Sequence, residues 1–472
     1  MNSRFLLILC LALLIAACAP QQQAFQATVA PTDIGAAAPV YSPTPTLTAT
    51  ATLTVTPSPT ATVTPTPTLT PSLTSTPSPT FTPTQPLVTL TAPAREGAPR
   101  AVLNRPADLA PTAGWSCGDF PCEDDIDGFM ARIQVPPGYQ LDHLGQFPGQ
   151  PMQIVYGPDD RLYATVLEDG ATRSGAVYML NADGSTTRYA GDFFSPVGLA
   201  FQPGTDVLYV SSRRLPEKDG ALWRIVPGDA PEIVLDDLPC CYGLIDNQPN
   251  GIVFGPDGYL YLGIGGLTDH GESLVPASAA YAEIQPLEAA ILRIQPHTGA
   301  VEAFARGLRN PYDITFDATG QFYATDQGLV SGQGDRLLVV EAGAHFGWPY
   351  WRTRGCEGCP VKPANLDVVP DAVSFLPYSI PRGLVAYTGT QFPQNMFNNL
   401  FVTLWNGTDD AQRVVRFDPL ALARADSSGE PVEGEPFVTG LIRPVDVAVA
   451  PDGSLVVADF IYGHVWRVSY TG

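Results

Sequence analysis

The sequence predicts an all-β protein, a six-bladed β-propeller that follows an export signal and a disordered Thr/Pro-rich linker. Three observations lead to this prediction: a short apolar N-terminal segment, a tract dominated by Thr and Pro, and a phrase that recurs six times after Trp115. We expect residues 1–17 to form a lipoprotein signal peptide, residues 18–112 a stalk and residues 113–472 the propeller.

The N-terminal segment is typical of an export signal. Arg4 precedes an apolar run from Phe5 to Ala17, which is too short to span a membrane comfortably. The run ends in Ile15-Ala16-Ala17-Cys18, which resembles the bacterial lipobox, whose cysteine is acylated. We therefore expect an exported protein, anchored through a lipid on Cys18 to the outer face of the bacterial cell membrane. A plain secretory signal with an incidental Cys18 is the alternative.

The stalk is defined by its composition. The segment from Pro43 to Thr84 consists almost entirely of Thr, Pro, Ser, Leu, Ala and Val. Proline lacks an N–H donor and pushes the preceding residue into an extended conformation, so this tract predicts a polyproline-II-like spacer without helix or inner strand. Thr and Ser beside Pro also suggest O-glycosylation, as a hypothesis.

The remaining sequence repeats a phrase of two apolar strands joined by a turn rich in Pro, Asp and Gly. Copies begin near Met152, Val197, Gly251, Tyr312, Gly383 and Val445. Further short apolar segments supply additional strands at Ala176–Leu180, Ala221–Ile225, Ala290–Ile294 and Val414–Phe417. Four strands in each unit, at spacings of roughly 45 to 70 residues, indicate propeller blades. An irregular two-sheet β protein is the alternative.

Composition excludes some partners. Hydrophobic residues make up 45% of the 472 residues, so a large core can form, whereas charged residues make up only 15%. The formal net charge of −22 repels phosphate backbones and therefore argues against a nucleic-acid partner. Such an acidic balance is compatible with oxygen-ligated cations such as calcium, although ordinary solvated surface charge explains it equally.

Four segments are more specific than the repeats. They are the stretch DNQPNGIVFGPDG at 246–258, Gly307-Leu308-Arg309-Asn310-Pro311, Asp326-Gln327-Gly328 and Gly347-Trp348-Pro349. In the order and spacing of these segments, the domain resembles the glucose/sorbosone dehydrogenase family, the soluble PQQ-dependent sugar dehydrogenase-like propellers. The resemblance extends from about Phe129 to Val468. The resemblance implies PQQ and calcium as cofactors, and oxidation of an aldose- or sorbosone-type sugar hydroxyl by hydride transfer to PQQ.

The resemblance also assigns roles to individual positions. It places catalysis at Asp246, Asn247 and Arg309, and cofactor binding at Arg309, Asn310 and Arg443. Calcium would be held by the carbonyl groups of Gly328 and Leu329, with Asp335 as an acidic residue in the following loop. Arg336 stands where the family usually has Glu, which weakens a second calcium site. The basic residue expected in the fifth blade is not evident in the stretch 404–408.

The sequence departs from the family at the catalytic base. The family has an Asp-His pair where this chain has Asp246-Asn247, and a neutral amide cannot accept a proton at useful pH. Gln248 cannot replace it for the same reason. His270, His345 or a nearby carboxylate are the substitutes that the sequence offers, with His345 more readily explained as packed structure.

Other polar residues have structural explanations. Asp313 and Asp446 stand just inside two of the repeats, and we expect them to hydrogen-bond turn backbone.

Six cysteines beyond Cys10 and Cys18 form three close pairs, which are Cys117/Cys122, Cys240/Cys241 and Cys356/Cys359. Export places them in an oxidising environment, so we expect local disulfides, with pairing inferred from nearness alone. A vicinal disulfide at Cys240-Cys241 would stiffen the loop before Asp246. Half of a zinc site at Cys356-Glu357-Gly358-Cys359 is the alternative for the last pair, although no second such motif accompanies it.

Two functions follow. The first is a sugar dehydrogenase-like oxidoreductase that acts on a sugar or polyol and passes electrons to an acceptor the sequence does not name; its catalytic competence depends on how Asn247 is compensated. The second is a non-catalytic propeller, displayed at the cell surface, that binds a ligand or a protein. A hydrolase is disfavoured because no Ser/His/Asp constellation or carboxylate pair stands out.

Overall fold

The structure is a computed structural model. It describes residues 121–241, 246–267, 284–328, 335–350, 363–375, 379–408, 411–422 and 434–472. The expected signal peptide and stalk lie outside the described residues. The same holds for Cys10, Cys18, Cys117, His270, Leu329, Cys356 and Cys359. No helix in the described part of the chain has the length and hydrophobicity needed to cross a bilayer.

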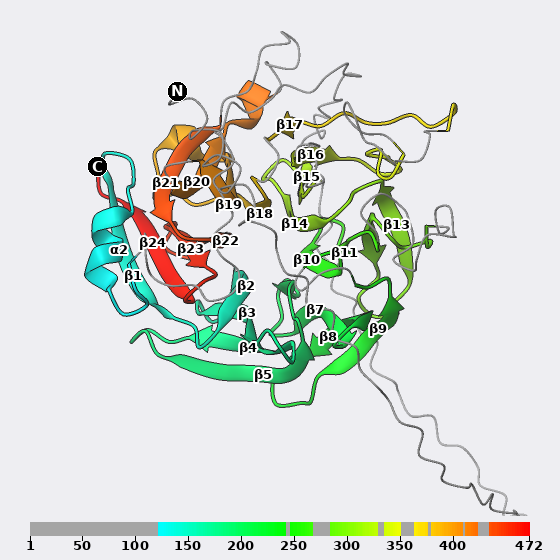
Figure 1. Ribbon diagram of the computed structural model, residues 1–472, viewed down its shortest axis with the longest axis horizontal. Coiled ribbons are helices and arrows are strands. Elements are labelled where there is room, and N and C mark those ends of the chain that lie inside the picture. The colour runs from blue at the N-terminus through cyan, green and yellow to red at the C-terminus, as the bar shows by residue number, and fades with distance from the viewer. Residues whose placement is uncertain are drawn as a thin grey trace, which may run out of the picture. The chain divides into compact units, whose positions relative to one another are not determined.

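The described strands form six antiparallel four-stranded blades around a common axis (Figure 1). Blade 1 contains β2 (Gln150–Tyr156), β3 (Leu162–Asp169), β4 (Ser174–Leu180) and β5 (Thr186–Phe194). Blade 2 contains β6 (Leu199–Phe201), β7 (Leu208–Leu215), β8 (Lys218–Ile225) and β9 (Glu232–Leu238). Blade 3 contains β10 (Pro249–Phe254), β11 (Leu260–Ile264), β12 (Ala290–Ile294) and β13 (Val301–Arg306).

The remaining blades follow the same order from the axis outward. Blade 4 contains β14 (Pro311–Phe316), β15 (Phe322–Asp326), β16 (Arg336–Val340) and β17 (Val373–Ser374). Blade 5 contains β18 (Pro381–Ala386), β19 (Leu400–Thr408), β20 (Ala411–Phe417) and β21 (Glu435–Leu441). Blade 6 contains β22 (Pro444–Val449), β23 (Leu455–Asp459), β24 (His464–Tyr470) and β1 (Tyr139–Gln146). The prediction of a six-bladed β-propeller is therefore confirmed within the described residues.

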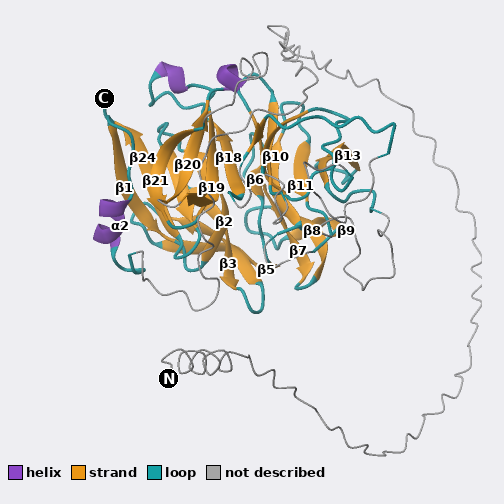
Figure 2. Cartoon of the chain, turned by 45° about the horizontal axis from the view of Figure 1, so that its top comes forward, coloured by secondary structure: helices purple, strands orange, loops and turns teal. Residues whose placement is uncertain are grey.

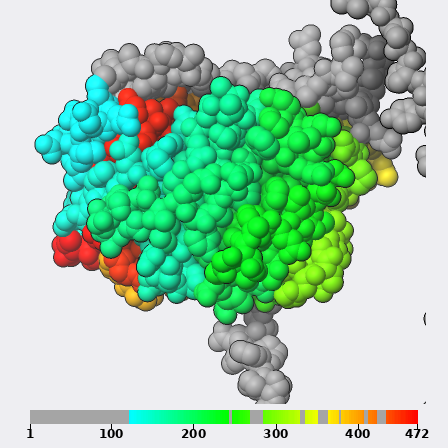
Figure 3. All heavy atoms as spheres, turned by 90° about the horizontal axis from the view of Figure 1, so that it is seen from below, coloured from blue at the N-terminus to red at the C-terminus, as the bar shows by residue number. Residues whose placement is uncertain are grey.

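The ring is closed by strands from opposite ends of the propeller sequence. β1 is the outermost strand of blade 6 and pairs with β24 from Tyr139↔Tyr470 to Gln146↔His464. Blades 1 and 2 are joined at their rims by one residue pair, Phe194↔Arg213, and Figure 3 shows their outer surfaces as one continuous face. Helix α2 (Ile126–Arg132) and the 3-10 helix η1 (Gln394–Met396) lie outside the blades (Figure 2).

Helix α2 was not anticipated from the sequence, because seven residues are too few to show a helical period. Asp125 caps its N-terminus by accepting a hydrogen bond from the Gly128 N–H at 2.9 Å. Phe129, which is 1% exposed, packs against Trp466 in blade 6 with ring centroids 5.7 Å apart. The helix thus covers the blade that closes the ring.

The core is divided into six apolar clusters, one between each pair of neighbouring blades. For example, Leu262 and Ile264 of blade 3 pack with Tyr209 and Leu222 of blade 2. Each inner sheet face is therefore buried by the next blade, and strands such as β11, β15 and β23 are buried at every position. This explains why the second strands read as continuous apolar runs. Burying one large aliphatic side chain contributes about 1.5–3 kcal/mol.

Neighbouring blades are also joined by hydroxyl groups near the axis. The second strand of four blades places a Ser or Thr whose hydroxyl donates to a carbonyl at the start of the next blade. The pairs are Thr165 to Val197, Ser211 to Asn250, Thr325 to Arg382 and Thr403 to Val445. In blades 3, 5 and 6, the accepting carbonyl group belongs to the start of the inner strand, where the register with the second strand shifts.

The axis itself contains two buried carboxyl groups, Asp313 on β14 and Asp446 on β22. Asp313 accepts hydrogen bonds from the N–H groups of Leu384 (2.7 Å) and Ile314 (2.8 Å), and Asp446 accepts one from Ile154 (2.6 Å). The expectation that they bond turn backbone was wrong: their partners lie in strands, and Leu384 and Ile154 belong to neighbouring blades.

The two carboxyl groups are neighbours. Burial raises the pKa of both, and for Asp446 the charge of Asp313 raises the pKa further. No N–H or O–H donor of the described residues reaches Asp446 Oδ1. A proton held between the two carboxyl groups accounts for this arrangement.

The interblade hydroxyl bonds can be tested with Thr325→Val, which preserves shape but leaves the buried Arg382 carbonyl without its 2.7 Å donor. We expect the free energy of unfolding to fall by about 1–3 kcal/mol, measured by urea denaturation. Thr187→Val, at an exposed position on β5, is the matched control and should change stability by less than about 0.5 kcal/mol. Equal losses in the two variants would contradict the assignment.

The carboxyl pair predicts a pH-dependent effect of Asp446→Asn. A carboxyl group whose folded-state pKa lies above its unfolded value of about 4 contributes its full stabilisation below about pH 4. This stabilisation is lost as the pH rises through the folded-state pKa. In Asp446→Asn, the amide can accept a hydrogen bond from the Ile154 N–H and donate one to Asp313. The variant therefore does not lose this stabilisation as the pH rises. We expect the melting temperature of the variant, relative to the native protein, to be higher at about pH 8 than at about pH 4. A difference that does not change with pH would contradict the shared proton.

Candidate functional site

Most of the residues that the sequence singled out gather at one mouth of the axis. The inner strands β10, β14, β18 and β22 all begin at this end of the ring. Asp246 and Asn247 stand just before β10, Arg309 and Asn310 just before β14, and Arg443 just before β22. Arg382, which the sequence analysis did not select, is the second residue of β18. Because these strands begin at the same end of the ring, three arginines and one acidic residue lie at the same mouth of the axis.

Asn310 joins blades 3 and 4 at this mouth. Its Oδ1 accepts hydrogen bonds from the Asn247 N–H (2.9 Å) and from Asn250 Nδ2 (2.8 Å). Its Nδ2 donates to Asp246 Oδ1 (3.3 Å) and to Gln327 Oε1 (3.2 Å). The side chain is fully buried, so it fixes the geometry of the loop before β10.

Asn247 points into the protein. Its backbone has a φ of +51°, and its Nδ2 donates to the carbonyl oxygens of Gly266 (2.7 Å) and Arg309 (3.1 Å). The residue is fully buried. Asn tolerates this left-handed conformation better than most residues do. The position that matches the family's base is thus occupied by an amide that holds the scaffold.

Asp246 forms an ion pair with Arg382. Arg382 Nη2 donates to Asp246 Oδ1 at 2.9 Å, and the side chains are 3% exposed for Arg382 and 29% exposed for Asp246. The guanidinium carbon lies 4.4 Å from the ring centre of Tyr312 and 4.6 Å from that of Trp405. Two aromatic faces therefore hold the cation in place.

Arg382 is a basic residue of the fifth blade that lies outside the stretch in which the sequence analysis looked for one. The search covered residues 404–408 on β19, whereas Arg382 lies on the inner strand of the same blade. Its ring contact with Trp405 brings it to that stretch in space. A signal was present in the sequence, since Arg382 directly precedes the Gly383 that opens the fifth repeat.

Arg443 lies beside the same tryptophan. Its Nη1 donates to the Trp405 carbonyl (3.2 Å) and to Asn406 Oδ1, and its guanidinium carbon is 5.9 Å from the Trp405 ring centre. Burial lowers the pKa of Arg443 to about 10; Asp459 opposes this shift and the charge of Arg382 adds to it. An anion at the mouth would relieve this repulsion.

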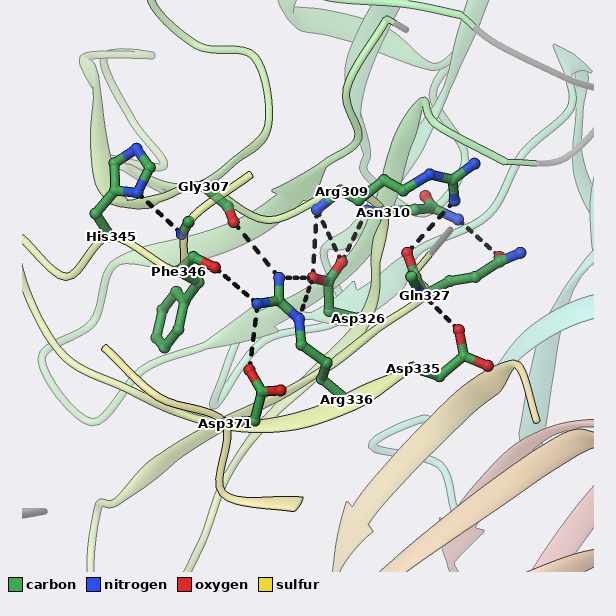
Figure 4. A network of polar contacts seen from close by, with 12 residues as sticks. Gly307, Arg309, Asn310, Asp326, Gln327, Asp335, Arg336, His345, Phe346 and Asp371 are labelled. Carbon is green, nitrogen blue, oxygen red and sulfur yellow. Dashed lines mark hydrogen bonds and ion pairs between the residues drawn. The ribbon is translucent and has the colours of Figure 1, made fainter. Parts of the chain in front are cut away.

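The Arg309-Asn310 backbone is held from below by a buried network in blade 4 (Figure 4). Asp326 accepts hydrogen bonds from the N–H groups of Arg309 (3.0 Å) and Asn310 (2.7 Å), and pairs with Arg336. Arg336 also donates to Asp371 (3.2 Å) and to the Phe346 carbonyl (2.7 Å). Arg336 is thus part of the blade's interior, a role that sequence reasoning missed.

Asp335 fastens the loop that follows β15. Its carboxylate oxygens accept from the N–H groups of Gly328 (2.7 Å) and Ile380 (2.6 Å). Burial raises its pKa to about 7, against the lowering effect of these two hydrogen bonds. Leu329, the other residue assigned to calcium, lies outside the described residues. Within the described ranges, no three His, Cys, Asp or Glu side chains come together as a metal site.

Of the two histidines proposed as substitute bases, His345 does not join this cluster. His345 Nδ1 accepts from the Gly347 N–H at 3.0 Å, and His345 forms a parallel bridge with Arg306. Figure 4 shows it on the opposite side of the Arg336 network from Asn310. His270 lies outside the described residues.

A disulfide links Cys240 to Cys241 shortly before Asp246. Cys122 is also disulfide-bonded, to a cysteine outside the described residues. The pairings of Cys117, Cys356 and Cys359 stay predictions.

The mouth is rich in cationic side chains. Arg309, Arg382 and Arg443 are each less than 5% exposed, and the half-buried carboxylate of Asp246 pairs with Arg382. Arg213 joins Gln248 at the edge of this group through a 2.5 Å hydrogen bond from Nε to Oε1. Planar guanidinium groups bind carboxylates in a bidentate manner, so the arrangement suits a flat ligand with several carboxylates.

The chain resembles known proteins in sequence and in fold. Residues 246–462 match the family model for glucose/sorbosone dehydrogenases. An uncharacterized protein of Borreliella burgdorferi is 27% identical over 201 residues, which cover 39% of this chain and 52% of that protein. This chain thus matches about half the length of that relative.

Two solved structures share the fold. The soluble aldose sugar dehydrogenase of Escherichia coli, in its apo form, gives a TM-score of 0.53 at 16% identity, covering 70% of this chain and 99% of that one. The PQQ domain of a pyranose dehydrogenase from Coprinopsis cinerea, in its holo form, gives 0.52 at 15% identity, covering 71% and 97%. Residues 246–462 thus match the glucose/sorbosone dehydrogenase family model, and the propeller shares its fold with these two solved structures.

Proposed function

We propose that the propeller binds PQQ at the mouth of its axis, together with calcium, and oxidises a hydroxyl group of an aldose-type sugar or a related polyol. The observation that carries this proposal is that Arg309, Arg382 and Arg443 lie at the starts of the inner strands at one mouth of the axis, where Arg382 pairs with the half-buried carboxylate of Asp246. PQQ is a flat ortho-quinone with three carboxylates, so its charge complements these cations.

The residues present fit such a ligand. Arg309, Asn310 and Arg443 hold positions that match the family's cofactor contacts, and all three are fixed by hydrogen bonds to neighbouring blades or loops. Asn406 Nδ2 is buried without an acceptor in the described residues, close to Arg443. Trp405 offers an aromatic ring between Arg382 and Arg443.

Each component has a distinct task. A bound ortho-quinone supplies a two-electron acceptor. Arg309 and Arg443 would bind and orient its carboxylates, and the buried blade 4 network keeps Arg309 and Asn310 in register. Calcium would be held by oxygen ligands around Gly328 and Leu329, where Asp335 shapes the loop. Export, the lipid anchor on Cys18 and an external electron acceptor remain part of this proposal.

A non-catalytic propeller that captures an anionic ligand is the second candidate. The inward position of Asn247 favours it, because the matching family position supplies the base. The two candidates share the cationic mouth and differ in turnover.

The proposal predicts that Arg443→Gln weakens PQQ binding. Losing one charge-assisted contact costs about 1.5–3 kcal/mol, so we expect the dissociation constant to rise about tenfold or more. Binding is measured in the presence of calcium by quenching of tryptophan fluorescence. Arg467→Gln, which removes an arginine paired with Asp142 on the outer strands of blade 6, is the control and should leave binding unchanged.

Turnover separates the two candidates. The protein loaded with PQQ and calcium is assayed with aldoses and an artificial electron acceptor. Saturable turnover supports the dehydrogenase, and PQQ binding without turnover supports the capture module. A native protein that binds no PQQ at all would refute both the site and its cofactor.

A further inference from the structure

We propose that Asp246 is the proton acceptor of this reaction and that Arg382 is the residue that positions it. The inference rests on the proposed function, and it replaces the base that the sequence lacks at Asn247. It assigns roles to two side chains on different blades, which become partners only in the folded ring.

The carboxylate of Asp246 has two unlike oxygens. Oδ1 accepts hydrogen bonds from Arg382 Nη2 at 2.9 Å and from Asn310 Nδ2 at 3.3 Å. Oδ2 has no hydrogen bond within the described residues. It is not among the buried atoms, and the side chain as a whole is 29% exposed, so this oxygen is open to solvent. One oxygen is thus anchored, and the other keeps its lone pairs for a substrate hydroxyl group.

Arg382 can hold Asp246 in one orientation because it cannot move itself. Its side chain is 3% exposed and lies between the rings of Tyr312 and Trp405. The Tyr312 hydroxyl in turn donates to the Met152 carbonyl at 2.8 Å, which ties the ring to blade 1. The backbone carbonyl of Arg382 accepts from Thr325 at 2.7 Å, so backbone and side chain are both fixed.

The neighbouring amide and carboxylate side chains bond to other groups, and the buried Asn247 Oδ1, an amide oxygen that is no useful proton acceptor, has no partner in the described residues. The amide of Asn247 donates to two backbone carbonyls, and the amide of Gln248 bonds to Arg213 and to the Ser195 carbonyl. Asp335 uses both oxygens on backbone N–H groups. Among these groups, Asp246 combines a carboxylate with an open oxygen.

Asp246 Oδ2 would accept the proton of the substrate hydroxyl group while the hydrogen on the same carbon would leave as hydride. A bound ortho-quinone would supply the two-electron acceptor for that hydride, and the alcohol would become a carbonyl group. Asp246 would pass its proton on to the reduced acceptor and return to its carboxylate form, and an external acceptor would later remove the two electrons.

The first test compares Asp246→Asn with the native protein and with Asp236→Asn, a control that removes a carboxylate paired with the surface residue Arg214. We expect Asp246→Asn to lower kcat by about 100-fold or more, because general-base catalysis contributes that much. PQQ affinity, measured by tryptophan fluorescence, should change by no more than about threefold. Asp236→Asn should retain native kcat and affinity.

Chemical rescue gives a second readout for the same role. In Asp246→Ala, added formate should restore part of the lost rate, since a small carboxylate can occupy the vacated space and accept the proton. Formate should not raise the rate of the native protein. A purely structural role for Asp246 would give no rescue.

The positioning role of Arg382 is tested by a double-variant cycle. Arg382→Met should lower kcat in the native background but cause no further loss when combined with Asp246→Asn, whereas a merely structural role would lower kcat in both backgrounds. Arg382→Lys should recover part of the rate. In the unloaded protein, Arg382→Met should lower the melting temperature less when Asp246→Asn is also present, because the carboxylate no longer needs its partner.

The outcomes separate this inference from the function on which it rests. Native kcat in Asp246→Asn, or equal losses for Arg382→Met in both backgrounds, would overturn the assignment while leaving a working quinone enzyme. Absence of quinone binding in the native protein would overturn the proposed function first, and this inference with it.

Discussion

The structure depends on apolar contact between blades. A four-stranded sheet of this protein presents hydrophobic side chains on both faces, and only the neighbouring blades can remove both from water. Six clusters around the ring satisfy this requirement within the described residues, and the cluster between blades 6 and 1 also includes Tyr312 from the inner strand of blade 4. Ring closure is therefore a condition of stability for every blade, and the polar axis is what remains when the apolar faces have been paired.

The polar axis explains where chemistry can occur. Inner strands begin with proline at positions such as Pro311, Pro381 and Pro444, where a missing N–H costs nothing and the register shifts directly afterwards. The residues at the first positions of the inner strands, and those just before them, cannot all pair within their own sheet. Their side chains therefore form hydrogen bonds and ion pairs with residues of other blades. Deeper along the axis, Asp313 and Asp446 make such bonds with backbone N–H groups; at the mouth, arginines and Asp246 do so with one another.

The sequence predicted the architecture well because it is encoded locally. The turn sequences and the apolar second strands each depend on residues that are close together in the sequence, and each copy of the repeat corresponds to one blade. Arg309, Asn310 and Arg443 were also identified, since short motifs mark them. Two features could not be derived in this way. The inward turn of Asn247 depends on its positive φ and on carbonyl groups supplied by Gly266 and Arg309, and the Arg382–Asp246 pair joins residues 136 positions apart. Arg336 was interpreted by its place in a motif, whereas burial beside Asp326 determines its role.

The pairing of β1 with β24 has a consequence for biogenesis. The outermost strand of the last blade is synthesised before any other strand of the propeller, and its hydrogen-bonding partner is synthesised last. Throughout chain elongation, the segment Tyr139–Gln146 must wait with an open strand edge, which invites pairing with other molecules. The ring can therefore close only after His464–Tyr470 has been synthesised. A prematurely terminated chain would keep the edge of β1 unpaired and would be prone to aggregate.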